Sequence, residues 1–455
     1  MEWVNDNSAA RKGCSRKPNL KEEIKALIRE NDSLKAKIVE LEDKLGLNSQ
    51  NSSLPPSRDI YRKKAKKKSD KKPGGQPGHK VHKRELMAAD EVVRCTIDTI
   101  CMCGGKITLE DEIIHQKAEL PEIKPIVTEY RLQRGDCRVC NKRITANLPE
   151  GVARDFLGPN AKTVISSLSG FFINSKREVQ QILGSIFNLN ISLGLVSNTE
   201  RRVSKKCASE YEKMKEELQG SEYLHIDETG HRNQGKRGWS WVITNKALTL
   251  LKVSESRGKK VLKSLLPEYD GIFVSDRYAV YNYFNRENRQ ICWAHLARDF
   301  ERFAHSKNVE VSKIGQALKS LSNKVFVVDK AKKQNLIDNL RFYRLVRKIR
   351  KRVKHFLRKM TRVANSTQAS RMAAKMLRSE DMMWKFLRKP EVIETTNNLA
   401  ERQIRRYVIY RKNSFFTWSE RGERFVERML SIFLTSRLNG QNPFQKLQNL
   451  VAVTA

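Results

Sequence analysis

YLHID at residues 223–227 opens the stretch that decides the fold, because the apolar residues change here from a helical to a strand period. Two later apolar runs flank the turn residues Asn245 and Lys246, which is typical of a hairpin. The runs after residue 227 are, in order, GWSWVIT (238–244), LTLLKVS (248–254), GKKVLKSLL (258–266), GIFVSD (271–276), YAVYNYF (278–284) and QICWAHL (290–296). We expect a strand, a hairpin, a helix, a strand, a helix and a strand, which together form an α/β core.

Three acidic residues stand at informative points of this order. Asp227 and Asp276 end two of the apolar runs, and Glu401 lies in the basic helix NNLAERQIRRYVIYRKNSFF at 397–416. Carboxylates at strand ends and on a nearby helix can converge on divalent cations, for which they are hard oxygen ligands. We expect Mg²⁺, with Mn²⁺ as a substitute, and the surrounding Lys and Arg suggest a phosphodiester substrate.

The overall charge points to the same partner. The 455 residues include 89 Lys and Arg against 51 Asp and Glu, which gives a net charge of +38. Such a field favours polyanions and disfavours acidic partners. The length predicts several domains. Because the sequence has no run of eighteen apolar residues and no signal-peptide core, we expect a cytoplasmic, nucleoid-associated protein with no membrane partner.

A heptad pattern marks the first predicted domain, a coiled coil at 18–47. Its core positions are Leu20, Ile24, Leu27, Asn31, Leu34, Ile38, Leu41 and Leu45. A single Asn among β-branched residues favours a parallel dimer in fixed register. We therefore expect a homodimer or a higher oligomer, with an amphipathic helix packed on its own domain as the alternative.

A basic linker at 48–89 follows the coiled coil. The segment NSQNSSLPPS (48–57) ends the helix, and eight of the eleven residues in RKKAKKKSDKK (62–72) are basic. Such a tract cannot form a core and is expected to remain disordered until it meets phosphate.

Two cysteine pairs define a predicted zinc-binding domain at 90–150. Cys101 and Cys103 lie in CMCGGK, and Cys137 and Cys140 lie in CRVCNK, on either side of the β-like run EIKPIVTEYRLQRG (122–135). Four thiolates on two short turns can hold a structural Zn²⁺ ion. Cys95 is a candidate substitute ligand, and free thiols are the alternative.

Two helical regions complete the chain. Helical patterns beginning near Ser175 and Ser192, both candidate N-caps, predict a helix-turn-helix-like DNA-binding domain at 155–218, with a structural bundle as the alternative. The second region, 301–390, contains RFYRLVRKIRKRVKHFLRKMTR (341–362), which has an apolar stripe and basic residues elsewhere. We expect this helix to contact DNA, with a solvated charged face as the alternative.

Several of these strings together resemble a known family. HIDETG, VSDRYAVYNYF, CWAHLARDFERF and NNLAERQIRRYVIYRKNSFFT are similar to the corresponding parts of insertion-sequence-66 family transposases, which are DDE transposases. The resemblance covers nearly the whole chain after residue 20, and the NNxAER string followed by RKN is its most specific part. The sequence departs from the family pattern at Cys101-x-Cys103, one residue short, and at Arg277, where a small residue is common.

The resemblance implies a ribonuclease-H-like catalytic core at 221–300 and 391–437, an α-helical insertion at 301–390 and a C-terminal segment at 438–455. Asp227, Asp276 and Glu401 would be the DDE triad and would hold two Mg²⁺ ions. The implied activity is binding of transposon terminal inverted repeats in double-stranded DNA, strand cleavage, and strand transfer into target DNA. Accessory proteins of the same element are further candidate partners.

Helical spacing extends the site around Glu401. Asn397, Asn398 and Arg405 share its helix face, and we expect them to hold DNA phosphates. The further phosphate candidates are Arg402, Arg406, Arg411 and Lys412. A His on an apolar strand is typical of a core, so His295 and its neighbour Trp293 are left open between core and site. Glu228 is expected to point away from Asp227, to the other face of the sheet.

Two other functions stay open at this point. A DNA-binding repressor or a domesticated remnant would keep the basic surface and lack catalysis. A structure-specific nuclease on the same fold would cut branched DNA without joining it.

Overall fold

The computed structural model describes residues 20–48, 51, 85–108, 112–364 and 367–452. The chain divides into two compact units, one of Met1–Ile60, Tyr130–Gln181 and Ile191–Ala455, and one of Tyr61–Glu129 and Ile182–Asn190. The basic tract at 62–72 and most of the predicted linker at 48–89 lie outside the described residues.

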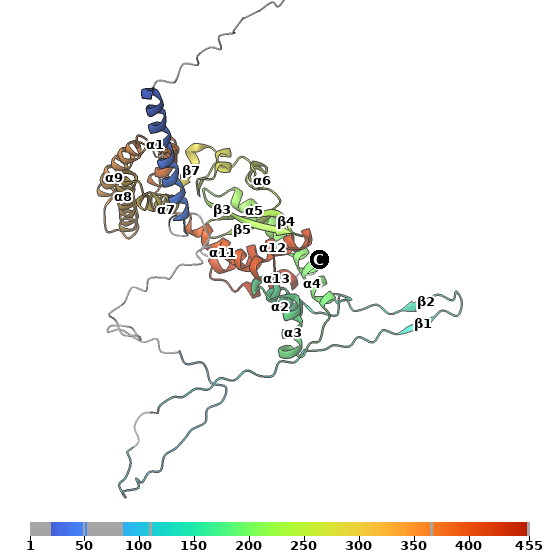
Figure 1. The fold of residues 1–455 in the computed structure, drawn as a ribbon. Coiled ribbons are helices and arrows are strands. Elements are labelled where there is room, and N and C mark those ends of the chain that lie inside the picture. The colour runs from blue at the N-terminus through green and yellow to red at the C-terminus, as the bar shows by residue number, and fades with distance from the viewer. Residues whose placement is uncertain (1–19, 49–50, 52–84, 109–111, 365–366, 453–455) are drawn as a thin grey trace, which may run out of the picture. The chain divides into compact units, whose positions relative to one another are not determined.

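A five-stranded sheet forms the centre of the first unit (Figure 1). Its strands are β3 (Tyr223–Asn233), β4 (Lys236–Thr244), β5 (Thr249–Ser254), β6 (Ile272–Ser275) and β7 (Arg289–Ile291), in the order β5-β4-β3-β6-β7. β3, β4 and β5 pair antiparallel, whereas β6 and β7 continue the sheet in parallel. Gln234 and Gly235, with φ of 49° and 76°, close the β3–β4 hairpin, as a tight two-residue turn requires.

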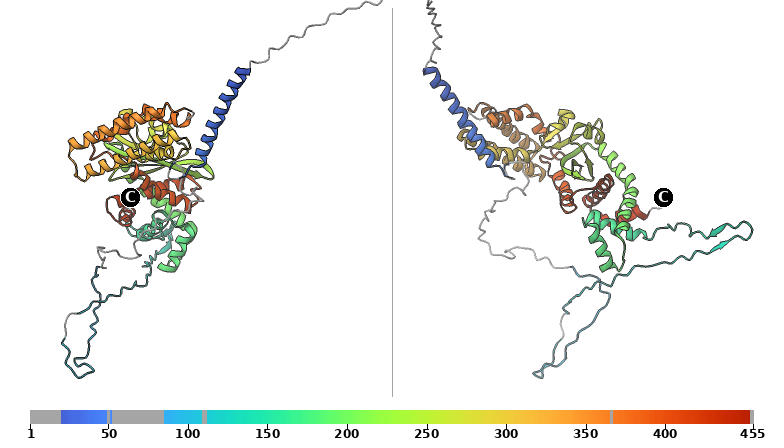
Figure 2. Two further views of the ribbon diagram at one scale, coloured as in Figure 1. Left: turned by 60° about the vertical axis from the view of Figure 1, so that its left-hand side comes forward. Right: turned by 45° about the vertical axis from the view of Figure 1, so that its right-hand side comes forward.

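Helices cover both faces of this sheet. On one face, Leu224, Ile226 and Trp241 pack against α5 (Ala208–Gln219) and α6 (Lys259–Leu265). On the other face, Val242, Leu251 and Val253 pack against α11 (Asn398–Asn413) and α12 (Glu420–Leu438). The red helices of the left-hand view of Figure 2 are these C-terminal helices lying against the sheet. The α/β core predicted from the sequence is therefore present.

A helical insertion separates β7 from α11. It comprises α7 (Trp293–Ala304), α8 (Val309–Lys333), α9 (Asn339–Met360), α10 (Thr367–Arg378) and the 3₁₀ helix η5 (Asp381–Leu387). Along α9 the buried side chains are Phe342, Val346, Ile349, Val353, Leu357 and Met360. The apolar stripe therefore faces the core of the insertion, and the basic residues between those positions face outward.

Two expectations near this junction need correction. The run at 290–296 is not one strand, because β7 ends at Ile291 and α7 begins at Trp293. The run reads as continuously apolar because a buried strand end and a buried helix start follow each other. The run at 278–284 forms only a short 3₁₀ helix, Ala279–Tyr283, where an α-helix was expected.

The region before the sheet is helical, as predicted. It contains α2 (Pro159–Ser166), the short π-helix η2 (Ser167–Phe171), α3 (Lys176–Phe187) and α4 (Leu193–Lys206). Ser175 and Glu178 form a reciprocal capping box at the start of α3, and the Ser192 hydroxyl caps α4. α4 packs on α12, and both α2 and α4 pack on α13 (Pro443–Ala452), so this region shares its packing with the C-terminal helices.

Among the described residues of the N-terminal third, α1 (Leu20–Leu45) is the longest regular element. The heptad leucines of α1 are uncovered, with Leu27 and Leu34 exposed by 59% and 54%. Between 122 and 145 only two short paired strands form, β1 (Arg134–Asp136) and β2 (Arg143–Thr145), so only the last two residues of the expected β-like run at 122–135 belong to a paired strand. Within the described part of the chain, no helix combines the length and apolar composition needed to cross a bilayer.

Candidate active site

The two aspartates lie side by side on neighbouring strands. β3 and β6 pair in parallel with His225 opposite Val274. Two residues further along each chain, Asp227 and Asp276 therefore stand at the same height, on strands about 4.8 Å apart. Asp276 comes directly after the last residue of β6, and its carboxylate accepts a 2.8 Å hydrogen bond from the Tyr278 N–H. The strand order thus aims both carboxylates at one edge of the parallel half of the sheet.

α11 is fixed across β3 by buried polar contacts at both ends. The Asn397 side chain donates to the Ile226 carbonyl at 2.8 Å, and its oxygen lies 3.1 Å from His225 Nδ1. One strand length away, the Tyr407 hydroxyl contacts His231 Nδ1. The hydroxyl of Tyr407 and the amide of Asn397 therefore set the position of the helix along the strand.

This anchoring brings Glu401 over Asp227. Along α11, Glu401 is four residues after Asn397, about 6 Å at 1.5 Å per residue. Along β3, Asp227 is two residues after His225, about 6.6 Å at 3.3 Å per residue. Both residues are therefore displaced by a similar amount from the Asn397–His225 contact, so Glu401 stands beside Asp227 along the direction of the strand.

The negative charges of both Asp276 and Glu401 act on Asp227. Burial is the largest cause that raises the pKa of Asp227 well above its ordinary value, and the negative charges of Glu228, Asp276 and Glu401 raise it further. A cluster of this kind is unfavourable for the fold unless cations or protons neutralise it.

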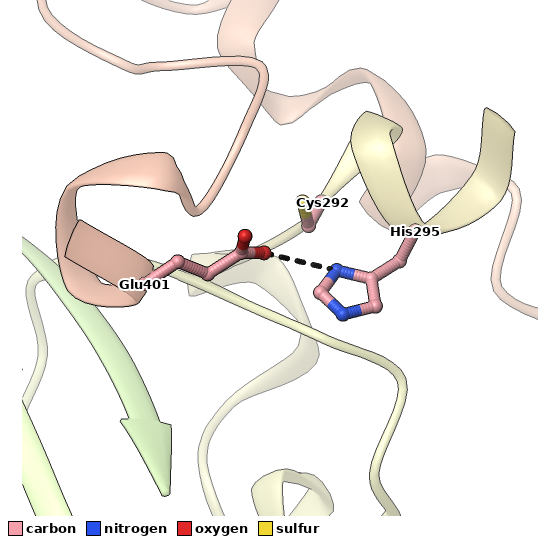
Figure 3. A group of neighbouring side chains, drawn as sticks. All are labelled: Cys292, His295 and Glu401. Atoms are coloured by element: carbon pink, nitrogen blue, oxygen red, sulfur yellow. Dashed lines mark ion pairs between the residues drawn. The ribbon is translucent and has the colours of Figure 1, made fainter. Parts of the chain in front are cut away.

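His295 and Cys292 form a further group with Glu401. Figure 3 shows the imidazole Nδ1 facing the carboxylate, 3.7 Å from Oε1, with the Cys292 thiol beside them. The three ligand atoms lie within 4.8 Å of one another. Burial lowers the pKa of His295 to about 3, so the ring is neutral at pH 7 and the contact is no ion pair. Both Nδ1 of His295 and Oε1 of Glu401 are buried without a hydrogen-bond partner.

These residues fit a site for divalent cations. Glu401 Oε1 has the Arg298 guanidinium at 3.6 Å but no hydrogen-bond donor, and a buried carboxylate oxygen without a donor is the kind of group that a metal ion can satisfy. Among the described residues, the ligand atoms of Asp227, Asp276 and Glu401 do not all lie within 4.8 Å of one another. Oxygens around a single Mg²⁺, at about 2.1 Å each, lie at most about 4.2 Å apart. As placed here, the three carboxylates therefore do not surround a single ion.

Glu228 occupies the opposite face of β3. It stands opposite Trp241 in the antiparallel register, whereas Asp227 stands opposite Val242, which packs on α11 and α12. Its carboxylate accepts from the Arg257 guanidinium at 2.9 Å and from the Tyr281 hydroxyl. The prediction that Glu228 points away from the site is confirmed.

Arg289 holds the backbone around Asp276 in place through hydrogen bonds. This β7 residue is only 3% exposed. Its guanidinium donates to the backbone carbonyls of Asp276 (2.7 Å) and Tyr278 (3.1 Å), and to the side chains of Ser275 (3.1 Å) and Asn282 (2.8 Å). One planar side chain therefore fixes the backbone on both sides of Arg277 and, with it, the direction of the Asp276 carboxylate.

The predicted phosphate contacts separate into two groups. Asn398, Arg402, Arg405 and Lys412 are exposed on α11. Arg406 donates to the Phe171 carbonyl and Arg411 to the Gly230 carbonyl, so both are held partly inside the protein. Asn397 is fully buried with its amide committed to β3 and its N–H 3.2 Å from the Cys292 sulfur. Its expected contact with DNA is therefore replaced by a positioning role.

The four predicted zinc ligands lie on two short turns. Cys101 and Cys103 stand in a loop closed by the bridge between Ile100 and Lys106. Cys137 and Cys140 stand in the β1–β2 turn, where the Cys137 N–H donates to the Lys142 carbonyl. The two turns belong to different compact units, so a shared zinc site remains a prediction.

Replacing Asn397 by Ala should loosen α11. The change leaves the Ile226 carbonyl and the His225 ring without partners in a buried place. We expect a loss of about 2–4 kcal/mol in unfolding free energy, measured by denaturant titration. Asn398→Ala, at the exposed neighbour, should change this free energy by no more than about 0.5 kcal/mol. Equal effects of the two substitutions would contradict the positioning role.

Comparison with known proteins agrees with this geometry. Residues 176–424 match the model of the Transposase IS66 family, and residues 11–85 match a family of unknown function, DUF6444. An uncharacterized protein, y4qI, from Sinorhizobium fredii (strain NBRC 101917 / NGR234) is 25% identical over 240 residues, which are 46% of this chain and 42% of that protein. The chain thus aligns with less than half of this relative's length. Because the IS66 match includes all three carboxylates and more than half of the residues, the chain belongs to the IS66 family of transposases.

Proposed function

We propose that this chain is a DDE-type transposase that binds the ends of its element, cleaves a DNA strand at each end and joins the freed ends to target DNA. The observation that carries the proposal is the placement of Asp276 and Glu401 near Asp227, whose pKa is raised by burial and further by the charges of Glu228, Asp276 and Glu401. The strand order β5-β4-β3-β6-β7, three antiparallel strands followed by two parallel ones, supports a ribonuclease-H-like core.

The chemistry follows from what the residues can do. Asp227, Asp276 and Glu401 would hold two Mg²⁺ ions, which when bound supply an activated oxygen nucleophile and neutralise the leaving oxygen in an in-line displacement. Asn397 and Arg289 hold the carboxylates in place. Exposed cations on α11, Arg402, Arg405 and Lys412, would bind the phosphates of the strand beside the scissile bond.

Strand cleavage and joining test the proposal directly. Inverted repeats in the DNA that flanks the gene would supply the substrate, labelled at its 3′ ends. We expect the purified protein to cleave and to transfer this DNA with Mg²⁺ or Mn²⁺, and not with EDTA. Glu401→Gln should bind the same ends and give neither product. Cleavage without joining would favour a structure-specific nuclease, and specific binding without either reaction would favour a repressor or a remnant.

The thiol turns predict bound zinc. If Cys101, Cys103, Cys137 and Cys140 share one ion, the purified protein should contain about one Zn²⁺ per chain by mass spectrometry of the metal. Cys137→Ser should lose most of this zinc. Cys207→Ala, at a buried thiol elsewhere in the chain, should keep it. Zinc-free wild-type protein would exclude the site.

The heptads of α1 predict self-association. Leu27 and Leu34 present uncovered apolar surface that a second copy would bury. The double substitution Leu27→Asp with Leu34→Asp should therefore reduce the mass measured by light scattering to that of a lower oligomer. Arg29→Asp, at an outward heptad position of the same helix, should leave the mass unchanged. An unchanged mass in the leucine variant would mean that α1 does not mediate association.

A further inference from the structure

The loop between α11 and α12 has a backbone conformation that its residues disfavour. Phe415 and Phe416 follow the end of α11 with φ of 51° and 73°. The left-handed region at a helix end is normally taken by glycine, because a side chain crowds the backbone there. Two consecutive bulky residues in this region persist only where the surrounding structure imposes the conformation, and such strain is found mainly at ligand-binding and catalytic positions.

Hydrogen bonds on both sides hold the loop in place. The Phe416 N–H donates to the Arg411 carbonyl at 3.2 Å, which closes the last turn of α11. Thr417 pairs with Asn233 at the tip of the β3–β4 hairpin. The side chain of Gln234 donates to the Trp418 carbonyl at 2.9 Å. The loop is thus bound to the same two elements that carry Glu401 and Asp227.

Two aromatic rings project from this fixed loop into solvent. Phe415 is 78% exposed and Trp418 is 70% exposed, whereas Phe416 between them packs its ring against His231. Because Phe415 buries little surface, its packing does not compensate the strain of its backbone. The loop therefore exposes flat apolar rings in a strained backbone conformation, and packing of the core does not explain this strain.

The surroundings of the rings are basic. The hairpin tip carries exposed Arg232, Lys236 and Arg237, and the end of α11 carries exposed Lys412. Glu420 is the exposed acid at the start of α12. A partner that is rich in negative charge and also offers flat aromatic faces fits this combination, and unpaired DNA has both properties.

The position of the loop relative to the carboxylates follows from both elements that hold it. From Glu401 to Ser414 the helix rises about 20 Å at 1.5 Å per residue. From Asp227 to Asn233 the strand rises about 20 Å at 3.3 Å per residue. The two paths agree, and this length equals about six base steps of a duplex at 3.4 Å each.

We propose that Phe415 and Trp418 form a stacking platform for unpaired nucleobases of the DNA strand, about six nucleotides from the scissile phosphate. The distance to the scissile phosphate rests on the proposed function, whereas the stacking itself does not. The platform would hold open or distorted DNA beside the site while the exposed cations bind its phosphates.

A pair of oligonucleotides tests the platform with the full chain in EDTA, where no cleavage occurs. One probe is a fluorescently labelled 20-nucleotide thymidine strand, and the other is an abasic strand of the same length with the same phosphates. We expect the wild type to bind the thymidine strand more tightly. Trp418→Ala and Phe415→Gly should each reduce this preference about 5- to 100-fold and leave abasic binding unchanged.

Companion variants exclude a folding defect. Gly accepts the left-handed conformation of residue 415, so Phe415→Gly should unfold at the wild-type temperature or above it. Trp418→Phe keeps an aromatic face and should keep most of the preference. Leu336→Ala, at another 70% exposed apolar residue, should keep all of it.

Three results would overturn the platform. They are equal binding of the two strands by the wild type, an unchanged preference in Trp418→Ala and Phe415→Gly, and an equal loss for both strands, which would indicate phosphate contact alone. If the rings bind a protein partner instead, the preference for the thymidine strand should also stay unchanged in Trp418→Ala and Phe415→Gly. If the preference falls as expected but the wild type never cleaves DNA, the stacking site stands and the proposed catalytic function fails.

Discussion

Asp227→Asn should abolish strand cleavage and at the same time raise the melting temperature of the metal-free protein. Cleavage should fall about 10²- to 10³-fold or more, because an amide is a poor ligand for the ions that stabilise the reacting oxygens. The thermal shift has a different cause. Asp227 is half-buried, and the charges of Glu228, Asp276 and Glu401 act on it, so its neutral replacement removes both a desolvation cost and that repulsion. We expect a gain of about 1–3 kcal/mol, or about 2–10 °C.

The pH dependence of the melting temperature provides an independent measurement. Because the folded state raises the pKa of Asp227, the folded chain holds this proton at pH values where the unfolded chain has released it. The metal-free wild type should therefore lose stability as the pH rises above the ordinary Asp pKa of about 4, and Asp227→Asn should lose less. Glu255→Gln, at an exposed carboxylate, should change neither cleavage nor this slope. A lower melting temperature in Asp227→Asn would contradict the repulsive cluster.

Arg289→Met should reduce both stability and catalysis although the side chain touches no carboxylate oxygen. The substitution removes the Arg289 donors from two backbone carbonyls, those of Asp276 and Tyr278, which keep only the Ser275 hydroxyl and the Tyr281 N–H as donors. We expect a loss of about 2–4 kcal/mol in stability. Cleavage at the permissive temperature should fall about 10²-fold, since the Asp276 carboxylate loses its fixed direction.

The metal dependence distinguishes positioning from general destabilisation. If Arg289 directs Asp276, its loss should increase the Mg²⁺ concentration needed for half-maximal cleavage, and Arg289→Lys should restore this property only in part because it has fewer donors. Arg286→Met removes an exposed ion pair with Asp381 and should change stability by no more than about 1 kcal/mol. An unchanged Mg²⁺ requirement in Arg289→Met would show that the residue is merely structural.

The strands and the three acidic positions could be predicted because their signals are local. Period-two apolar runs and a turn at Asn245 suffice for the β4–β5 hairpin, in which Asn245 Oδ1 accepts from the Ala247 and Leu248 N–H groups. The polar second half of β3, up to Asn233, and its hairpin with β4 gave no such apolar signal. Helical spacing likewise placed Asn397 and Arg405 on the face of Glu401. Helical spacing does not show how far a side chain is buried, however. Only the packing of α11 on β3 shows that Asn397 is buried and Arg405 exposed.

His295 and Arg289 could not be assigned from sequence for a related reason. The run at 290–296 hides the change from strand to helix, and this change turns His295 toward Glu401. An Arg in a protein with net charge +38 gives no signal of burial. Zinc binding by the four cysteines stays a prediction. The spacing of the thiols indicates a metal ion, and binding of that ion would complete the fold of the segment around them.

The order in which the carboxylates appear along the chain affects biosynthesis. The whole helical insertion lies in the sequence between Asp276 and Glu401. Its two ends are joined by a 2.8 Å hydrogen bond from the Trp293 N–H to the Thr395 carbonyl. A nascent chain on the ribosome therefore lacks its third carboxylate until the insertion has been synthesised. Prematurely terminated products would retain basic surfaces but would lack one of the acidic residues that the proposed chemistry requires.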